Sequence, residues 1–207
     1  WDRLDPMTLS TEALEAGPVG RAAFWRTMVA LADSLGEPQP NPAHHALVEL
    51  ERQGRLEAIL TQNVDGLQQA AGSDPGLVLE LHGNLSWCVE PLTERRFPTA
   101  EIIARVKAGE RDPKDDGRPI RPELVVFGDP LPADTMRRAW SLARTCDLML
   151  VLGTSLTVHP AADLPVLARH SGAKLVIVTL GPTPVDHLAD LRIDGPLGEV
   201  FVPAVEG

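Results

Sequence analysis

Thr-Gln-Asn-Val-Asp-Gly-Leu (residues 61–67) follows an apolar run at residues 56–60, and Glu-Leu-His-Gly (residues 80–83) ends a second apolar run at residues 77–81. Short apolar runs that alternate with helical stretches are typical of parallel strands covered on both faces. Ligands bind at the carboxyl ends of such strands. The two stretches therefore bring amides, a carboxylate and the potential base His82 to a predicted enzyme site.

Further periodic segments predict the rest of the fold. Strands are expected at residues 56–60, 77–81, 148–152, 174–178 and 199–202, and helices at about residues 42–53, 132–145, 160–170 and 184–191. The first of these helices has Asn41 as its N-cap and Pro42 at its first position. The alternation predicts an α/β fold with a doubly wound, Rossmann-like parallel sheet.

The alternation is interrupted between residues 84 and 121. This segment contains prolines and charged residues, one helical stretch at residues 99–107 and a polar tip at residues 108–117. We interpret residues 84–121 as a small subdomain inserted into a single domain that spans residues 1–207.

Composition excludes several classes of partner. The chain has 207 residues and a formal net charge of -10, which repels a phosphate backbone, so no direct nucleic-acid partner is expected. No apolar run approaches the ~20 residues that span a bilayer. The start of the sequence has no signal-peptide pattern. We therefore expect a cytoplasmic protein that does not bind membranes.

Cysteine usage argues against a structural metal. The only cysteines are Cys88 and Cys146, and neither belongs to a Cys-x-x-Cys pair. A four-cysteine zinc site cannot be built from them, so no zinc is expected.

Two later motifs complete a family pattern. Residues 150–162 read Leu-Val-Leu-Gly-Thr-Ser-Leu-Thr-Val-His-Pro-Ala-Ala, and residues 121–132 read Arg-Pro-Glu-Leu-Val-Val-Phe-Gly-Asp-Pro-Leu-Pro. Together with residues 61–67 and 80–83, they resemble the sirtuins, the NAD-dependent protein lysine deacylases. The resemblance extends from about Asn41 to the end of the chain.

The resemblance implies an activity and a set of catalytic groups. NAD would be a co-substrate, and an acyl-lysine protein or peptide would transfer its acyl group to ADP-ribose with release of nicotinamide. Gln62 would contact ribose, and Asn63 and Asp65 would lie around the nicotinamide and its ribose. His82 would be the general base for a ribose hydroxyl.

The resemblance also implies where the adenosine half of NAD binds. Gly153, Thr154 and Ser155 can offer hydroxyls and backbone N–H groups to a ribose or phosphate. Adenine contacts would come from Thr179, Gly181 and Leu197. Sirtuins usually have Asn at the position of Thr179 and a small residue at that of Leu197.

A substrate-binding strand is expected at residues 125–128. Val125, Val126, Phe127 and Gly128 could pair with an extended acyl-lysine peptide through main-chain hydrogen bonds. The family commonly has Trp at the position of Val126, so the acyl-chain preference stays open.

Each pattern also has a purely structural interpretation. The Asn63-Val64-Asp65-Gly66 segment is typical of a helix-capping turn, and a single histidine at a strand end is often structural. The turn at Gly153 is common in proteins that bind no nucleotide. Residues 125–128 fit an ordinary core strand.

The start of the sequence departs from the family. Sirtuins begin with a strand and a Gly-Ala-Gly turn around the pyrophosphate, whereas Trp1 to Ser10 resembles the segment after that region. The chain is therefore expected to be an N-terminally incomplete catalytic domain, either a fragment or a natural truncation. The alternatives to a deacylase are a non-catalytic module that binds nucleotide, ADP-ribose or a partner, and an NAD hydrolase or ADP-ribosyltransferase.

Overall fold

The computed structural model describes residues 6–206, which divide into two compact units. The first unit comprises Trp1–Pro38, Asn63–Gly66 and His82–Pro132, and the second comprises Gln39–Gln62, Leu67–Leu81 and Ala133–Gly207. Residues 1–5 of the expected sirtuin-like start and residue 207 lie outside the described residues.

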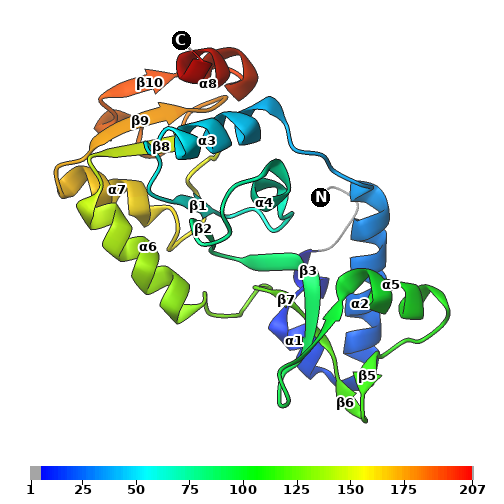
Figure 1. Cartoon of the computed structure of the whole chain (residues 1–207). Coiled ribbons are helices and arrows are strands. Elements are labelled where there is room, and N and C mark those ends of the chain that lie inside the picture. Colours follow the sequence, from blue (N-terminus) through cyan, green and yellow to red (C-terminus); the bar gives the residue numbers. More distant parts are fainter. Residues whose placement is uncertain (1–5, 207) are drawn as a thin grey trace. The chain divides into compact units, whose positions relative to one another are not determined.

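Parallel strands form the centre of the second unit (Figure 1). In one sheet β1 (Ile59–Thr61) pairs with β2 (Val78–Glu80), and in another β9 (Lys174–Val178) lies between β8 (Leu148–Leu152) and β10 (Leu191–Ile193). The predicted strands at residues 148–152 and 174–178 are confirmed at both ends. The strand expected at residues 77–81 is present but shorter, and the strand expected at residues 56–60 is present but starts later and ends at Thr61.

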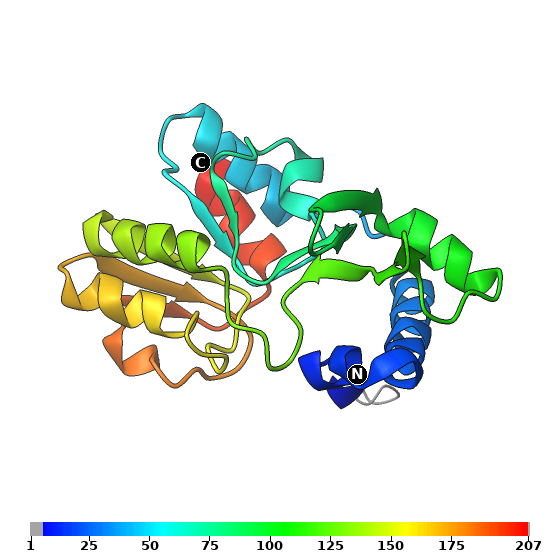
Figure 2. The ribbon, with the colours of Figure 1, turned by 90° about the horizontal axis from the view of Figure 1, so that it is seen from below.

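Helices cover these strands on two sides (Figure 2). On one side α3 (Pro42–Arg52) packs against α8 (Leu197–Glu206), and on the other α6 (Ala133–Thr145) packs against α7 (Asp163–His170). Leu150 and Leu152 of β8 contact the cluster that contains α3 and α8. Val151 belongs to the opposite cluster with Leu175 and Ile177. Because side chains alternate along a strand, β8 contacts an apolar cluster on each of its faces, and the doubly wound prediction is confirmed.

The start of α3 follows its sequence signals. Asn41 Oδ1 accepts hydrogen bonds from the amides of Ala43 at 2.9 Å and His44 at 3.2 Å. His44 Nδ1 in turn accepts one from the Asn41 amide at 3.1 Å, which completes a capping box. The predicted cap and the position of Pro42 are confirmed.

Two element predictions for the second unit are wrong. Residues 199–202 belong to helix α8 and not to a strand, because Phe201 and Val205 are one helical turn apart and both pack into the cluster with α3. A short apolar run alone does not distinguish a strand from a helix. The helix expected at residues 184–191 is instead the short 3₁₀ helix η2 (Asp186–Leu188) followed by β10, because Asp186 accepts hydrogen bonds from Thr183 and closes a turn.

The first unit combines helices with an antiparallel sheet of order β4-β3-β7. Its elements are η1 (Pro6–Thr8), α1 (Thr11–Glu15), α2 (Gly17–Leu35), β3 (Gly83–Glu90), β4 (Arg95–Pro98), α5 (Thr99–Lys107), β5 (Lys114–Asp115), β6 (Arg118–Pro119) and β7 (Arg121–Leu124). Phe24, Trp25 and Met28 of α2 pack with Ile102 of α5 in the core of this unit.

Within residues 6–206, no helix combines the length and apolarity needed to cross a membrane.

The region between residues 84 and 121 is more regular than expected. It contains most of the antiparallel sheet, and its helix α5 has the predicted bounds. In the predicted polar tip, β5 and β6 form a hairpin whose loop residues Asp116 and Gly117 have φ values of 48° and 80°. An Asp-Gly pair favours this type of hairpin turn. The contacts group residues 84–121 with Trp1–Pro38, and their origin as an insertion stays a prediction.

Gly83 begins β3 at a close contact with β7. Its φ is 75°, and a Cβ atom there would lie 2.2 Å from the carbonyl oxygen of Glu123. Side chains rarely tolerate that φ, and the contact leaves no room for a methyl group. The backbone of β7 therefore approaches Gly83 closely.

We predict that Gly83→Ala destabilises the first unit more than Gly109→Ala. Gly109 also has a positive φ, 107°, but an added Cβ would meet no atom within 4 Å. Backbone strain alone costs roughly 1–3 kcal/mol, and Gly83→Ala adds the clash with Glu123. Urea unfolding of both variants measures the difference, and equal losses of unfolding free energy would contradict it.

Candidate nucleotide site

Three residues predicted to act at the nicotinamide and its ribose lie in the first unit. Asn63 and Asp65 belong to a segment whose Val64 carbonyl accepts a hydrogen bond from the Leu85 amide at 2.8 Å. His82 lies just before Leu85 in sequence, so the two segments run side by side. His82 is partly exposed, and its carbonyl accepts a hydrogen bond from the Val125 amide at 2.9 Å. The backbone on both sides of the potential base is thereby fixed.

Gln62 lies in the second unit with the predicted ribose-binding turn. Gln62 Nε2 donates to Thr154 Oγ1 at 3.5 Å, which joins the residue after β1 to the turn after β8. Thr154 Oγ1 also accepts the Leu156 amide at 3.3 Å, and Ser155 Oγ lies 3.0 Å from Thr157 Oγ1. The turn thus places several hydroxyls at the carboxyl end of a parallel strand.

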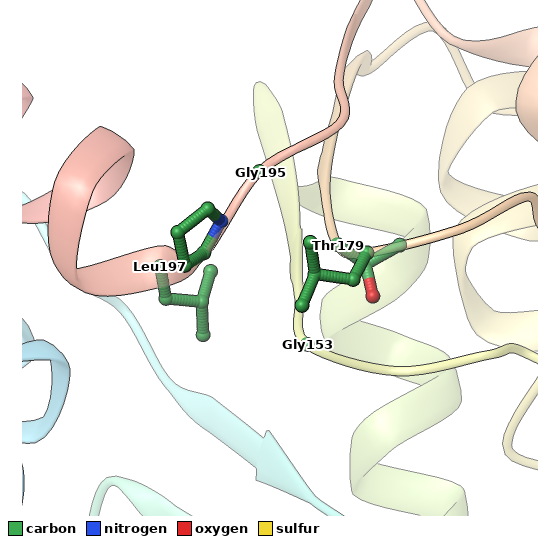
Figure 3. A pocket seen from close by; sticks show the side chains of 6 residues that line it. Gly153, Thr179, Gly195 and Leu197 are labelled. Atoms are coloured by element: carbon green, nitrogen blue, oxygen red, sulfur yellow. The ribbon is translucent and has the colours of Figure 1, made fainter.

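A cavity of about 200 Å³ lies at the carboxyl ends of β8, β9 and β10 (Figure 3). Its lining residues are Gly153, Thr179, Leu180, Gly195, Pro196 and Leu197. Gly153 donates its amide to Val178 at 2.9 Å, which fixes the turn after β8 to β9. The structure therefore brings together Gly153, Thr179 and Leu197, three residues expected to hold the adenosine half of a nucleotide.

Leu197 narrows this cavity from the first position of α8. A Cβ atom on Gly153 would lie 3.2 Å from Leu197 Cδ1, so only glycine leaves room for this leucine without adjustment. Gly181, also predicted as a contact, is not among the lining residues. Gly195 and Pro196 line the cavity but were not predicted. A Gly-Pro pair after a strand at the predicted carboxyl edge is the signal that could have identified them.

The strand expected at residues 125–128 is not formed. β7 ends at Leu124, and Phe127 forms only an isolated bridge with Ser10. The Phe127 amide donates to Leu9 at 3.1 Å, and its carbonyl accepts the Thr11 amide at 2.9 Å. Leu9 and Thr11 thus occupy the main-chain groups of Phe127, which a peptide was expected to use.

Asp129 further constrains this segment. Its carboxylate accepts hydrogen bonds from Thr11 Oγ1 at 2.7 Å, from the Val126 amide at 3.3 Å and from Arg121 at shorter range. Burial opposes the charge, but these hydrogen bonds and the Arg121 charge keep the pKa of Asp129 below its usual value. Val125 and Gly128 extend the same segment, so all four predicted substrate residues lie together in the first unit.

Comparison with known proteins identifies the family. Residues 1–160 match the Sir2 family. The chain belongs to the Sir2 family. It is 39% identical over 211 residues to the NAD-dependent protein deacylase 2 of Archaeoglobus fulgidus, an alignment that covers 100% of this chain and 80% of that protein.

Solved Sir2 structures have the same fold. A Sir2 bound to an acetylated peptide is 36% identical, with a TM-score of 0.85, over 96% of this chain and 81% of that structure. A Sir2 with a p53 peptide and NAD+ is 37% identical, with a TM-score of 0.84, over 95% of this chain and 80% of that structure. The Rossmann-like fold and the resemblance to sirtuins are therefore confirmed.

The residues present do not fit the zinc site that resemblance to this family implies. Cys88, where the zinc cysteines would begin, is fully buried beside Phe97 and Ile120 and lies 3.3 Å from Thr99 Oγ1. Burial raises the pKa of its thiol to about 11, which disfavours the thiolate that binds metal. Among residues 6–206, no group of three or more His, Cys, Asp or Glu side chains could hold a metal ion.

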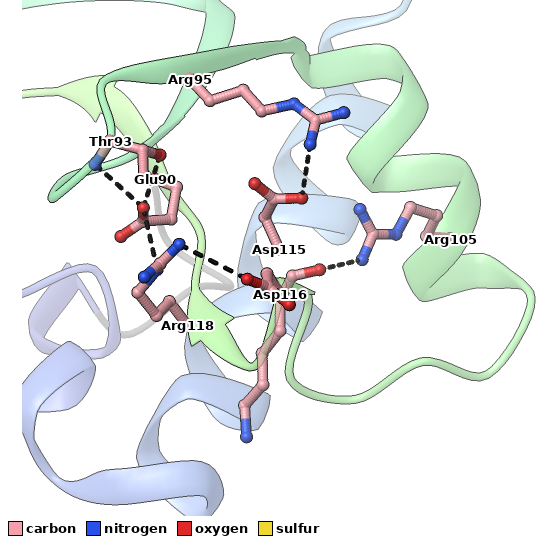
Figure 4. A network of polar contacts seen from close by, with 8 residues as sticks. Glu90, Thr93, Arg95, Arg105, Asp115, Asp116 and Arg118 are labelled. Atoms are coloured by element: carbon pink, nitrogen blue, oxygen red, sulfur yellow. Dashed lines mark hydrogen bonds and ion pairs between the residues drawn. The ribbon is translucent and has the colours of Figure 1, made fainter.

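A carboxylate stabilises the turn where the zinc cysteines would begin (Figure 4). Glu90, whose side chain is 1% exposed, accepts hydrogen bonds from the Leu92 amide at 3.0 Å, the Thr93 amide at 3.0 Å and Thr93 Oγ1 at 2.6 Å. Arg118 Nε lies 3.2 Å from the same carboxylate. The Thr93 hydroxyl, followed by the two amides and Arg118, lowers the pKa of Glu90 against the opposing effect of burial.

Ion pairs connect the remaining parts of this region. Arg21 of α2 holds Asp112 through two hydrogen bonds of 2.6 and 2.8 Å. Arg95 of β4 pairs with Asp115 of β5 at 3.0 Å. Such bidentate and short charged contacts fix orientation as well as distance.

We predict that Glu90→Gln lowers the unfolding free energy at pH 7 and makes this free energy depend less on pH in the acid range. The pKa of Glu90 is lowered in the folded state, so its charge stabilises the fold above the unfolded pKa of about 4.3. That contribution declines below the unfolded pKa and is lost as pH falls through the lower folded pKa, so the stabilities of wild type and variant should approach each other as the solution is acidified.

Urea unfolding between pH 3 and pH 7 measures this effect. Glu123→Gln is the matched control, because Glu123 pairs with Arg96, whose side chain is 51% exposed. An unfolding free energy of Glu90→Gln that parallels wild type at every pH would contradict the assignment.

Proposed function

We propose that this chain is an NAD-dependent protein lysine deacylase of the sirtuin type. The observation that carries the proposal is the cavity lined by Gly153, Thr179 and Leu197 at the carboxyl ends of parallel strands, in a member of the Sir2 family. The deacylase relative and the Sir2 structures with an acetylated peptide and with NAD+ support the same chemistry.

The cavity suits one part of NAD. Its volume of about 200 Å³ is below the ~300–1,000 Å³ of sites that enclose a whole drug-sized ligand. We assign the cavity to the adenine base. Thr154, Ser155 and Gln62 would contact the neighbouring ribose. Gly181 would act indirectly, because it follows Leu180, which lines the cavity. NAD is a co-substrate in this scheme.

His82, Asn63 and Asp65 carry the proposed chemistry. The acyl oxygen of the substrate attacks the ribose carbon that holds nicotinamide, and the carbon–nitrogen bond breaks with its electron pair on nicotinamide. Asn63 and Asp65 orient the leaving group and its ribose. His82 then takes a proton from a ribose hydroxyl, whose oxygen attacks the acyl carbon. The bond from that carbon to the lysine nitrogen breaks, and the free amine leaves with a proton. Water from solvent adds to the same carbon, the bond to the first ribose oxygen breaks, and the acyl group stays on ADP-ribose as an ester.

An acyl-lysine protein or peptide is the proposed partner. Val125, Val126, Phe127 and Gly128 are the proposed contacts, with Phe127 offering a side chain that is 53% exposed. Because the main-chain groups of Phe127 bond to Leu9 and Thr11, the peptide would use side-chain contacts at this position. The acyl-chain preference is not assigned.

We also propose that the first unit is stable without zinc. Cys88 packs in the apolar core, while Glu90 and the Arg21–Asp112 pair stabilise the surrounding turns. The sequence given contains no Gly-Ala-Gly tripeptide. The cytoplasmic location and the single-domain description stay predictions.

A non-catalytic nucleotide-binding module is the second candidate. The contact of Leu197 with Gly153 favours a non-catalytic module, because the Leu197 side chain occupies space beside the proposed adenine position. NAD hydrolysis or ADP-ribosyl transfer would use the same residues without an acyl-lysine peptide.

We predict that the purified chain releases nicotinamide from NAD when an acetyl-lysine peptide is present. His82→Ala should lower this release at least ~100-fold, because general base catalysis typically contributes 10²–10⁴-fold. His170→Ala, an exposed histidine at the end of α7, is the matched control and should retain wild-type release. Chromatography measures nicotinamide and the acylated product.

Other outcomes distinguish the alternatives. Release that does not need the peptide would favour NAD hydrolysis or ADP-ribosyl transfer. ADP-ribose binding without release would favour the non-catalytic module. Wild-type release by His82→Ala would contradict the role of His82.

A further inference from the structure

Two loops form opposite parts of the nucleotide cavity. Thr179 and Leu180 follow β9, and residues 195–197 follow β10. The Thr179 amide donates to the Ile193 carbonyl at 3.3 Å. The shape of the cavity therefore depends on how these two strand ends are held together.

Arg192 of β10 contacts both loops. Its guanidinium donates to the Gly181 carbonyl after β9 and to the Ile193 carbonyl at the end of β10. Its Nε donates to Asp186 Oδ1 at 3.0 Å. The Arg192 side chain is only 20% exposed, so these contacts are partly shielded from water.

The partners of Arg192 are themselves fixed. Asp186 accepts hydrogen bonds from Thr183 Oγ1 at 2.6 Å and from the Thr183 amide at 3.1 Å. Asp194 Oδ1 accepts the Gly181 amide at 3.1 Å, so Gly181 is held at both its N–H and its carbonyl. Arg192 is the side chain that joins the loop after β9, the turn at η2 and the end of β10.

A guanidinium is well suited to this task. It presents five N–H donors in a rigid plane, whereas a lysine ammonium is a compact charge on a flexible stem. Hydrogen bonds to charged groups contribute more than neutral ones, and a partly buried carbonyl that loses its donor is destabilised.

We propose that Arg192 is a positioning residue for nucleotide binding. It holds the loop at Thr179 and Leu180 in a fixed position relative to the loop at residues 195–197. The inference rests on the proposed function, since it assumes that the cavity binds the adenine half of NAD. Arg192 itself is not among the lining residues and acts through Gly181 and Ile193.

Arg169 provides a matched control in the same unit. It donates to the carbonyls of Leu188 at 3.2 Å and Ala173 at 3.5 Å, and it lies 3.6 Å from Asp190. Arg169 therefore has the same kinds of partner as Arg192, two carbonyls and one carboxylate. No partner of Arg169 is next in sequence to a residue that lines the cavity, whereas Gly181, a partner of Arg192, directly follows Leu180. A purely structural role would make the two arginines equivalent.

The test compares wild type, Arg192→Met, Arg192→Lys and Arg169→Met by calorimetric titration with ADP-ribose. Loss of one charge-assisted hydrogen bond corresponds to about tenfold in affinity. We expect Arg192→Met to bind at least about tenfold more weakly, Arg192→Lys to recover part of the loss, and Arg169→Met to stay near wild type. In turnover assays, the KM for NAD should rise in Arg192→Met while the KM for peptide stays constant.

Amide hydrogen exchange provides a second readout that needs no ligand. Exchange at Leu180, Gly181 and Gly195 should accelerate in Arg192→Met and not in Arg169→Met. Equal ADP-ribose affinity of Arg192→Met and wild type would overturn the inference, as would equal losses in both methionine variants. If wild type binds no ADP-ribose, the proposed function fails, and unchanged exchange in Arg192→Met would separately overturn the positioning role.

Discussion

The parallel pairing of β8, β9 and β10 is the interaction on which the candidate nucleotide site depends. Leu152 lies opposite Val178, and Ile193 also lies opposite Val178, so the three strands end at one level. The residues that follow them, including Gly153 and Thr179, therefore meet at one edge and line one cavity. A slip of one residue would move each side chain to the opposite face and bury the wrong groups.

The two units are stabilised by different interactions. Apolar clusters on both faces of β8 and β9 dominate the second unit, and polar groups there, such as Arg192 and Asp186, fix loops at the strand ends. The first unit has an apolar core around Phe24 and Trp25, and its turns depend on charged side chains such as Glu90. The antiparallel sheet of the first unit therefore combines an apolar core with charged side chains at its turns, in a sequence that has only two cysteines.

The sequence predicted elements best where one local signal was strong. Continuous apolar runs identified β8 and β9, and a capping residue followed by proline identified the start of α3. The run at residues 199–202 was misassigned, because its helical character depends on packing against α3. The strands β3, β4 and β7 were not predicted, since β3 in the middle of the sheet also depends on a partner that is distant in sequence, as with Cys88 opposite Pro122.

The candidate site was predictable to a similar extent. Gly153, Thr179 and Leu197 do line one cavity, whereas the position of Gly195 in its lining depends on β10, which was not predicted.

The most direct test of a nucleotide site at these strand ends is an amide NMR titration with ADP-ribose. We predict saturable shifts of the Gly153, Leu180 and Gly195 amides. Shifts confined to residues 84–121, or no saturable shift at all, would contradict the account.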